Sequence, residues 1–133
     1  MRAVLDPNVL ISAVIGPGPP AQILEAWSRG DVDLVASELL LEELTDVLAR
    51  PKLARRISSD EAVALVRLLR SAATLVEDPS DPPRRSSDPD DDYLLALAEN
   101  AGARLVSGDR HLLELASELP VVSPREFLEL LVS

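Results

Sequence analysis

The sequence predicts an α/β fold in which a parallel β-sheet is covered by helices on both faces. The first observation is that short apolar runs typical of strands alternate with longer helical patterns along the chain. The second is that the strand runs are continuously apolar, as strands buried on both faces are. The third is size, since 133 residues with 47% hydrophobic composition can bury one core. We therefore expect a single domain over residues 1–133.

The first half of the chain begins with the run AVLD at 3–6, an apolar strand that ends in Asp6. Pro7 and further apolar residues follow, which is a favourable helix start, because aspartate caps a helix and proline fits its first position. The run GPGPP at 16–20 is a loop. The remaining elements of this half are a helix at 20–29, a strand at 32–37, and helices at 38–49 and 59–72.

The second half continues the alternation around one long loop. The strand at 73–77 leads into EDPSDPPRRSSDPDDD at 77–92, which is rich in proline, serine and aspartate and is predicted to be a surface loop within the domain. Further elements are a helix at 91–101, a strand at 103–109, a helix at 110–118, a strand at 120–123 and a helix at 124–132. The first and fourth strands end in Asp6 and Asp109. Because ligands of open parallel sheets bind outside the carboxyl ends of the strands, these aspartates are the first functional indication.

Composition limits the kinds of site that the chain can build. No cysteine is present, which excludes disulfides and thiolate metal sites, and a single histidine excludes a histidine-rich site. A metal would therefore be held by carboxylates, the ligands that Mg²⁺ and Mn²⁺ prefer. The apolar run after Arg2 is too short for a signal peptide or a membrane span, so we expect a cytoplasmic protein. The net charge of −10 opposes a nucleic-acid partner unless the acids have another task.

Helical periodicity separates neighbouring acids. In DPDDDYLLALA, Asp91 lies about 50° from the centre of the apolar face and Asp92 about 150° from it. We predict that Asp91 is directed toward the interior and Asp92 toward solvent. In SELLLEELTDVL, Glu43 lies at the border of the apolar stripe, whereas Glu42 points away from it. Glu42 is therefore predicted to be a surface residue.

Each of the four inward acids also has a structural explanation. Asp6 and Asp109 can be helix caps, Asp91 suits the positive end of a helix dipole, and Glu43 can be a surface residue with a buried stem. Taken singly, the structural explanation is favoured. Taken together, four carboxylates in one small site would repel one another unless a divalent cation compensated them. Such a cation would activate water for phosphoryl-type hydrolysis and would allow a phosphate to approach.

Basic residues gather in two places, for which two interpretations stay open. They are Arg50, Lys52, Arg55 and Arg56 in RPKLARR, and Arg84 and Arg85 in the long loop. They could contact a phosphate backbone or be ordinary solvated charges. His111, early in a helical pattern, is expected at the surface. No glycine-rich phosphate loop and no Gly-x-Ser-x-Gly elbow is present.

Four stretches resemble, in order and spacing, the PIN-domain family, and in particular its bacterial toxin components of toxin-antitoxin systems related to VapC. They are VLDPNVLISAV, VASELLLEELTDVLARPKL, SDPDDDYLLALAENAGARLVSGDRHLL and VVSPREFLELL. The resemblance covers nearly the whole chain. It implies a Rossmann-like α/β/α sandwich with a central parallel sheet of four to five strands. It also implies a metal-dependent endoribonuclease that works as a homodimer and is silenced by a cognate antitoxin covering the acidic groove.

The resemblance also assigns roles to particular residues. The four acids of the family fall on Asp6, Glu43, Asp91 and Asp109, which would hold one or two Mg²⁺ or Mn²⁺ ions. Asn8 and Ser107 would be supporting residues, with Ser107 in place of the family's threonine. The main departure is Pro7, which stands where the family usually has Thr or Ser and removes a hydroxyl and a backbone donor.

Two other functions remain open at this stage. The chain could be a degenerate PIN domain that binds RNA or protein without catalysis, and Pro7 would then be a sign of the lost activity. An aspartyl phosphotransfer domain on a flavodoxin-like sheet would also gather acids at strand ends. That domain would need a lysine near its fifth strand, and the single lysine here is Lys52.

Overall fold

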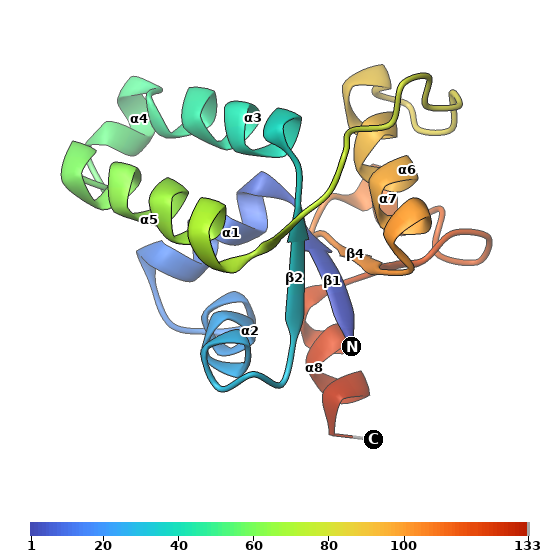
Figure 1. Cartoon of the computed structure of the whole chain (residues 1–133), viewed down its shortest axis with the longest axis horizontal. Coiled ribbons are helices and arrows are strands. Elements are labelled where there is room, and N and C mark those ends of the chain that lie inside the picture. The colour runs from blue at the N-terminus through green and yellow to red at the C-terminus, as the bar shows by residue number, and fades with distance from the viewer. Residues whose placement is uncertain (133) are drawn as a thin grey trace.

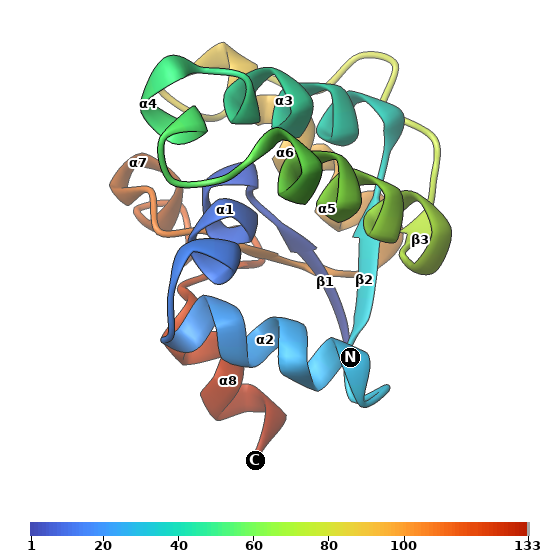
Figure 2. The ribbon, with the colours of Figure 1, turned by 90° about the vertical axis from the view of Figure 1, so that its left-hand side faces the viewer.

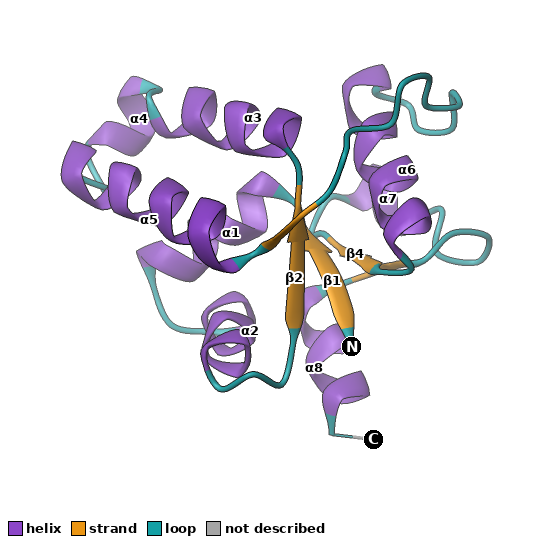
Figure 3. Ribbon diagram, in the orientation of Figure 1, coloured by secondary structure: helices purple, strands orange, loops and turns teal. Residues whose placement is uncertain are grey.

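Five parallel strands form the centre of the protein, whose computed structural model describes residues 1–132 (Figures 1 and 3). They are β1 (Arg2–Leu5), β2 (Asp33–Ala36), β3 (Thr74–Leu75), β4 (Arg104–Val106) and β5 (Val121–Val122). Their order in the sheet is β3-β2-β1-β4-β5. This confirms the predicted parallel α/β fold. The order differs from the 2-1-3-4-5 order of flavodoxin-like sheets, which removes the support for a phosphotransfer domain.

The strands are shorter than their apolar runs. The runs at 73–77 and 103–109, for example, contribute two and three residues to the sheet. The next residue of each run still donates one bond to the neighbouring strand, Val76 to the carbonyl of Ala36 at 2.9 Å and Ser107 to that of Val122 at 3.0 Å. Asp6 still extends the pairing of β1, since its amide donates to the carbonyl of Val106 at 3.0 Å.

Helices cover both faces of the sheet (Figure 2). Within the described residues they are α1 (Pro7–Ile15), α2 (Pro19–Ser28), α3 (Glu38–Leu48), α4 (Pro51–Ala54), α5 (Ser59–Ala72), the 3₁₀ turn η1 (Pro89–Asp91), α6 (Asp92–Ala101), α7 (Arg110–Leu113) and α8 (Pro124–Leu131). Side chains of α1, α2, α3, α5 and α8 contribute to one apolar cluster, and those of α6 and α7, with Leu40 of α3, contribute to the other. Successive side chains of β1 point to opposite faces of the sheet, so Ala3 and Leu5 lie in the first cluster and Val4 lies in the second.

Local sequence explains where the helices begin and end. Asp6, Ser37, Ser58 and Ser123 each accept a hydrogen bond from a first-turn amide, and the last two form capping boxes with a glutamate three residues on. Gly102 ends α6 with φ of 63°, a left-handed conformation that favours glycine.

Two helical predictions need correction. The helix expected at 110–118 ends at Leu113, and the chain continues in turns in which the amides of Leu115 and Ala116 bond three residues back. These tighter turns bring the chain back to β5 over a short distance. The sequence reasoning also missed α4, a single turn that begins at Pro51 in the basic run. No helix within residues 1–132 is long and apolar enough to span a bilayer.

Candidate metal centre

The carboxyl ends of β1 and β4 bring the first two acids together. These strands are neighbours in register, with Leu5 opposite Val106, and their carboxyl ends lie between α3 and α6 (Figure 1). Asp6 follows β1 and is 6% exposed, and its Oδ1 accepts the amide of Asn8 at 3.0 Å. Asp109 follows β4 after two residues, and its Oδ1 accepts the amide of His111 at 2.9 Å. Both acids therefore cap helices, as the sequence predicted.

Ser107 connects the two aspartates. Its side chain is fully buried, and its hydroxyl donates to Oδ2 of Asp6 at 2.9 Å. The same oxygen accepts the amide of Asp109 at 3.0 Å. Ser107 therefore fixes Asp6 directly and fixes the backbone of Asp109, so the two carboxylates are held relative to each other.

The other two acids come from helices on opposite sides of this edge. Glu43, on α3, is half-buried, and its Oε2 accepts the hydroxyl of Tyr93 at 2.9 Å. Asp91, at the end of η1 and the N-cap of α6, is also half-buried. Glu42 is exposed, so the predicted contrast between Glu42 and Glu43 is confirmed.

The charges of these acids act on one another. Burial raises the pKa of Asp91 to about 7, and the neighbouring charges of Asp88, Asp6, Asp109 and Glu43 add to that rise. The pKa of Asp91 therefore depends on the charges of the other three acids that the sequence predicted. The four side chains share one region although they are distant in sequence.

The pKa values of Asp6 and Glu43 change in the same direction. Burial raises the pKa of Asp6 against the opposing hydrogen bonds from Asn8 and Ser107, and the charge of Asp109 raises it further. Burial also raises the pKa of Glu43, partly offset by the hydrogen bond from Tyr93 and by the charge of Arg50. These carboxylates therefore repel one another when all of them are ionised.

The donor chemistry of this cluster fits a hard divalent cation. Its ligand atoms are carboxylate oxygens, and a cation would relieve the repulsion that raises the pKa values. Among residues 1–132, however, no three acidic, histidine or cysteine side chains converge closely enough to hold an ion by themselves.

Two hollows open on either side of the acids. One, of about 440 Å³, is lined on its polar side by Asp6, Asn8, Ser12 and Asp109. The other, of about 350 Å³, lies between α3 and the long loop and includes Glu43, Glu42, Asp46, Asp90 and Tyr93 in its wall. Asp6 and Asp109 therefore line the first hollow, and Glu43 lines the second.

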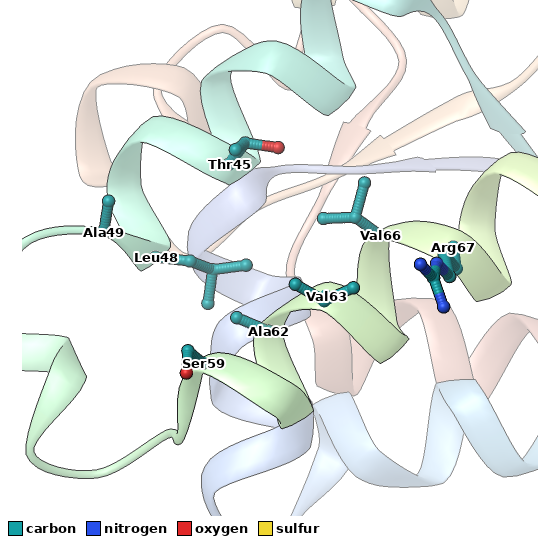
Figure 4. Close-up of a pocket in the computed structure, with 8 residues that line it drawn as sticks. All are labelled: Thr45, Leu48, Ala49, Ser59, Ala62, Val63, Val66 and Arg67. Atoms are coloured by element: carbon teal, nitrogen blue, oxygen red, sulfur yellow. The ribbon is translucent and has the colours of Figure 1, made fainter.

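A third hollow, of about 310 Å³, lies between α3 and α5 and contains none of the four acids (Figure 4). Its wall is mostly apolar, with Leu48, Ala62, Val63 and Val66 among its residues. It is thus separate in position and in chemistry from the acidic centre.

The prediction for Asp92 was wrong. Its side chain is 1% exposed, and its Oδ1 accepts the amides of Arg85 and Ser86 at 3.1 and 2.8 Å. Burial alone would raise the pKa of Asp92, but these hydrogen bonds and the charge of Arg84 lower it. The helical angle was sound, but the long loop folds back over that side of α6 and covers it. Asp92 therefore anchors the loop.

The basic residues divide into two groups. Arg50, Lys52, Arg55 and Arg56 are all exposed in and around α4. The loop arginines are engaged instead, since Arg85 pairs with Glu99 at 2.6 Å with a side chain only 23% exposed, and Arg84 lies 3.7 Å from Asp92. His111 is exposed, as predicted.

The sequence reasoning missed Tyr93 as a neighbour of the acids. No role was assigned to it from the sequence, and the structure places its ring in the second apolar cluster. The sequence carries no signal for the direction of its hydroxyl, because that direction depends on how α3 and α6 face each other.

This chain is similar in sequence to known proteins. The family model described as PIN domain matches residues 2–111, a range that contains all four acids. The uncharacterized protein MJ1680 of Methanocaldococcus jannaschii is 26% identical over 140 residues, which cover 97% of this chain and 90% of that protein.

Solved structures share the fold. PAE2754 from Pyrobaculum aerophilum is 20% identical with a TM-score of 0.67, over 99% of this chain and 90% of that one. VapBC2 from Rickettsia felis, bound to a DNA fragment from its promoter, is 14% identical with a TM-score of 0.62. The match covers 92% of this chain and 98% of that one. VapBC-1 from nontypeable Haemophilus influenzae is 16% identical with a TM-score of 0.61. The match covers 94% of this chain and 99% of that one. The family match and the shared fold together lead to one conclusion: this chain belongs to the PIN domain family.

Proposed function

We propose that this chain is a single PIN-like domain that acts as a metal-dependent endoribonuclease. The observation that carries the proposal is the pKa of Asp91, which is raised to about 7 by burial and by the charges of Asp88, Asp6, Asp109 and Glu43. Their mutual charge is the support for a compensating cation at this place. PIN domains form a nuclease superfamily whose members typically depend on metal, and the match over residues 2–111 makes that chemistry the expected one here.

In this proposal Asp6, Asp91 and Asp109 are the principal ligands of one or two Mg²⁺ or Mn²⁺ ions, directly or through water. When bound, the ion supplies a polarised water and neutralises charge on the phosphate. Glu43 holds a second ion or orients the attacking water, and Asn8 and Ser107 position the ligands. Hydrolysis forms a new bond from the water oxygen to phosphorus, breaks one phosphodiester P–O bond and places a proton on the leaving oxygen.

The exposed basic residues support an RNA substrate. Burial raises the pKa of Glu43, and the charge of Arg50 is among the effects that oppose this rise, so the basic segment begins within electrostatic range of that acid. Lys52, Arg55 and Arg56 continue it on the exposed surface around α4. We propose that these four residues contact the RNA backbone on its way to the acidic centre.

The partners of the proposed enzyme follow from its structural neighbours. VapBC2 and VapBC-1 are toxin-antitoxin complexes whose fold this chain shares. We propose that the chain is the toxin of a type II toxin-antitoxin system, that it forms a homodimer, and that a cognate antitoxin covers the acidic groove. The net charge of −10 suits a basic segment of such a partner.

The test is cleavage of RNA by the purified protein in Mn²⁺. The wild-type protein should cut RNA, and Asp6→Asn should lower the rate by about 100-fold or more, because it removes a charged ligand. Asp31→Asn is the matched control, since Asp31 is exposed and paired with Arg29 away from the acids. Equal cleavage by wild type and Asp6→Asn would refute the site.

The second candidate function is a PIN domain that binds without cutting. The observation in its favour is Pro7, which occupies the first position of α1 next to Asp6 and brings no hydroxyl. Calorimetry with millimolar Mn²⁺ separates the two functions. Absence of binding would favour the non-catalytic module.

A further inference from the structure

Tyr93 links the two helices that carry Glu43 and Asp91. It lies in the first turn of α6, its side chain is 7% exposed, and its ring packs in the second apolar cluster. Its hydroxyl donates to Oε2 of Glu43 at 2.9 Å. Among residues 1–132 this is the one side-chain hydrogen bond that joins α3 to α6.

The bond restricts a side chain that would otherwise be mobile. A glutamate at the border of a helix has three rotatable side-chain bonds, whereas a tyrosine has two and its ring is held here by packing. The hydroxyl of Tyr93 therefore has a fixed place, and it fixes Oε2 of Glu43 in turn. Oε1 of Glu43 accepts no hydrogen bond within the described part of the chain, so it stays available to a cation or to a bound water.

The position of Tyr93 in the chain also matters. Asp91, which lies at the N-cap of α6, is only two residues before it. The first turn of α6 thus brings one acid to the centre and holds a second acid that comes from α3. Ser107 does the corresponding task for Asp6 and Asp109.

We propose that Tyr93 is a positioning residue that holds the carboxylate of Glu43 in place beside Asp91, so that acids from α3 and α6 act on the same divalent cation. The inference rests on the proposed metal-dependent function. It adds a residue that touches neither cation nor RNA and acts through Glu43. Groups that orient a metal ligand typically change metal affinity or activity by about 10- to 100-fold.

A purely structural role is the competing explanation, since a buried tyrosine hydroxyl usually finds a partner. The two explanations differ in Mn²⁺ affinity measured by calorimetry. Tyr93→Phe keeps the ring and removes the hydroxyl, and it should weaken Mn²⁺ binding about tenfold. Thr45→Val is the matched control, because the hydroxyl of Thr45 is also on α3 but donates to the carbonyl of Leu41. It should leave Mn²⁺ affinity unchanged.

A double-mutant cycle shows whether Tyr93 acts through Glu43. In a Glu43→Ala background, Tyr93→Phe should cause no further loss of Mn²⁺ affinity. In cleavage assays, Tyr93→Phe should lower kcat about tenfold and leave KM for RNA unchanged, since the RNA contacts are elsewhere. Equal Mn²⁺ affinity of wild type and Tyr93→Phe, or additive losses in the cycle, would overturn the inference.

One measurement needs no variant. The chain has a single tyrosine, so isotope-labelled tyrosine gives one ring signal in an NMR spectrum. Titration with Mg²⁺ should shift that signal with the same midpoint as binding measured by calorimetry. If Mg²⁺ binds and the signal does not move, the inference is overturned while the proposed function stands. If wild-type protein binds neither ion, the proposed function itself fails, and the inference fails with it.

Discussion

The cap formed by Asp6 leaves its carboxylate able to accept further partners. Its Oδ1 accepts the amide of Asn8, and its Oδ2 accepts the hydroxyl of Ser107. An ionised carboxylate has about four lone-pair positions, so both oxygens can still accept a further partner. The structural and functional explanations of Asp6, which the sequence presents as competitors, can therefore both hold.

Ser107 offers the sharpest test at this scale. Ser107→Ala removes the donor to Asp6 and leaves the buried amide of Asp109 without its acceptor. We expect the free energy of unfolding to fall by about 2 kcal/mol and Mn²⁺ affinity to fall about tenfold. Urea denaturation and calorimetry measure the two effects. Ser107→Thr keeps the hydroxyl and should retain Mn²⁺ affinity; a tenfold loss in that variant would contradict the role given to the hydroxyl.

The raised pKa of Asp91 predicts a pH-dependent stability of the metal-free protein. Its folded-state pKa of about 7 exceeds the ordinary value of 3.8, so the folded state binds this proton more tightly than the unfolded state. Stability should therefore be greatest below pH 4 as far as this group is concerned, and fall as the pH rises toward 7. Asp91→Asn should reduce that fall and stabilise the metal-free protein at neutral pH by about 1 kcal/mol, a value lowered for partial exposure.

Thermal unfolding between pH 4 and 8 measures this effect. Saturating Mg²⁺ should remove the difference between wild type and Asp91→Asn or reverse it, because the ion stabilises the ionised acids of the folded state. The assignment would be contradicted by the following result. Without metal, the stability of the wild-type protein rises steadily over that pH range, by as much as the stability of Asp91→Asn does.

At the scale of elements, the long loop is tied to the helices on both sides of the acidic edge. The carboxylate of Asp78 accepts the amide of Leu39 at the start of α3, at 3.0 Å. Asp92, at the start of α6, accepts hydrogen bonds from the amides of Arg85 and Ser86 in the loop. The loop thus closes the outer wall of the hollow that contains Glu43 and Tyr93, to which its Pro82 contributes.

Asp92 tests the anchoring of this loop. Asp92→Ala leaves two backbone amides without their acceptor, and we expect the free energy of unfolding to fall by about 3 kcal/mol. Asp90→Ala is the matched control, since Asp90 is two residues away and exposed, and its side chain accepts no hydrogen bond from residues 1–132. Its effect should stay within about 0.5 kcal/mol. Equal effects of the two variants in urea denaturation would show that Asp92 does not hold the loop.

The same elements show what could be predicted from sequence. Periodicity predicts α5 and the half-buried position of Glu43, because both depend on one helix packed against one core. It fails for Asp92 and for the hydroxyl of Tyr93, because their partners are more distant in sequence. The loop amides that cover Asp92 lie six and seven residues away, and Glu43 lies fifty residues from Tyr93. Local patterns carry no information on such contacts.

At the scale of the whole molecule, charge is unevenly placed. The net charge is −10, yet Arg50, Lys52, Arg55 and Arg56 form an exposed basic segment at the end of α3. The order of the strands, which the sequence leaves open, puts β1 next to β4 and so brings Asp6 and Asp109 together. Topology therefore places two acids from distant parts of the chain at one edge of the sheet.

The basic segment predicts a salt-dependent affinity for RNA. Changing Lys52 and Arg55 to glutamine should weaken RNA binding and reduce the slope of log affinity against log salt concentration by about 1. Arg29→Gln is the control, because Arg29 is exposed but paired with Asp31 away from α4. Fluorescence anisotropy with a labelled single-stranded RNA in Ca²⁺ measures the slope. An unchanged slope in the double variant would remove this segment from the RNA path.

The central claim is that Asp6, Glu43, Asp91 and Asp109 form one divalent-cation centre. A calorimetric titration of the metal-free protein with Mn²⁺ tests it most directly, repeated with each acid changed to its amide. We predict that the wild-type chain binds one or two Mn²⁺ ions. Each of the four variants should bind them at least about tenfold more weakly, while Asp31→Asn binds as the wild type does. Wild-type affinity in Asp6→Asn and Asp91→Asn would contradict the account.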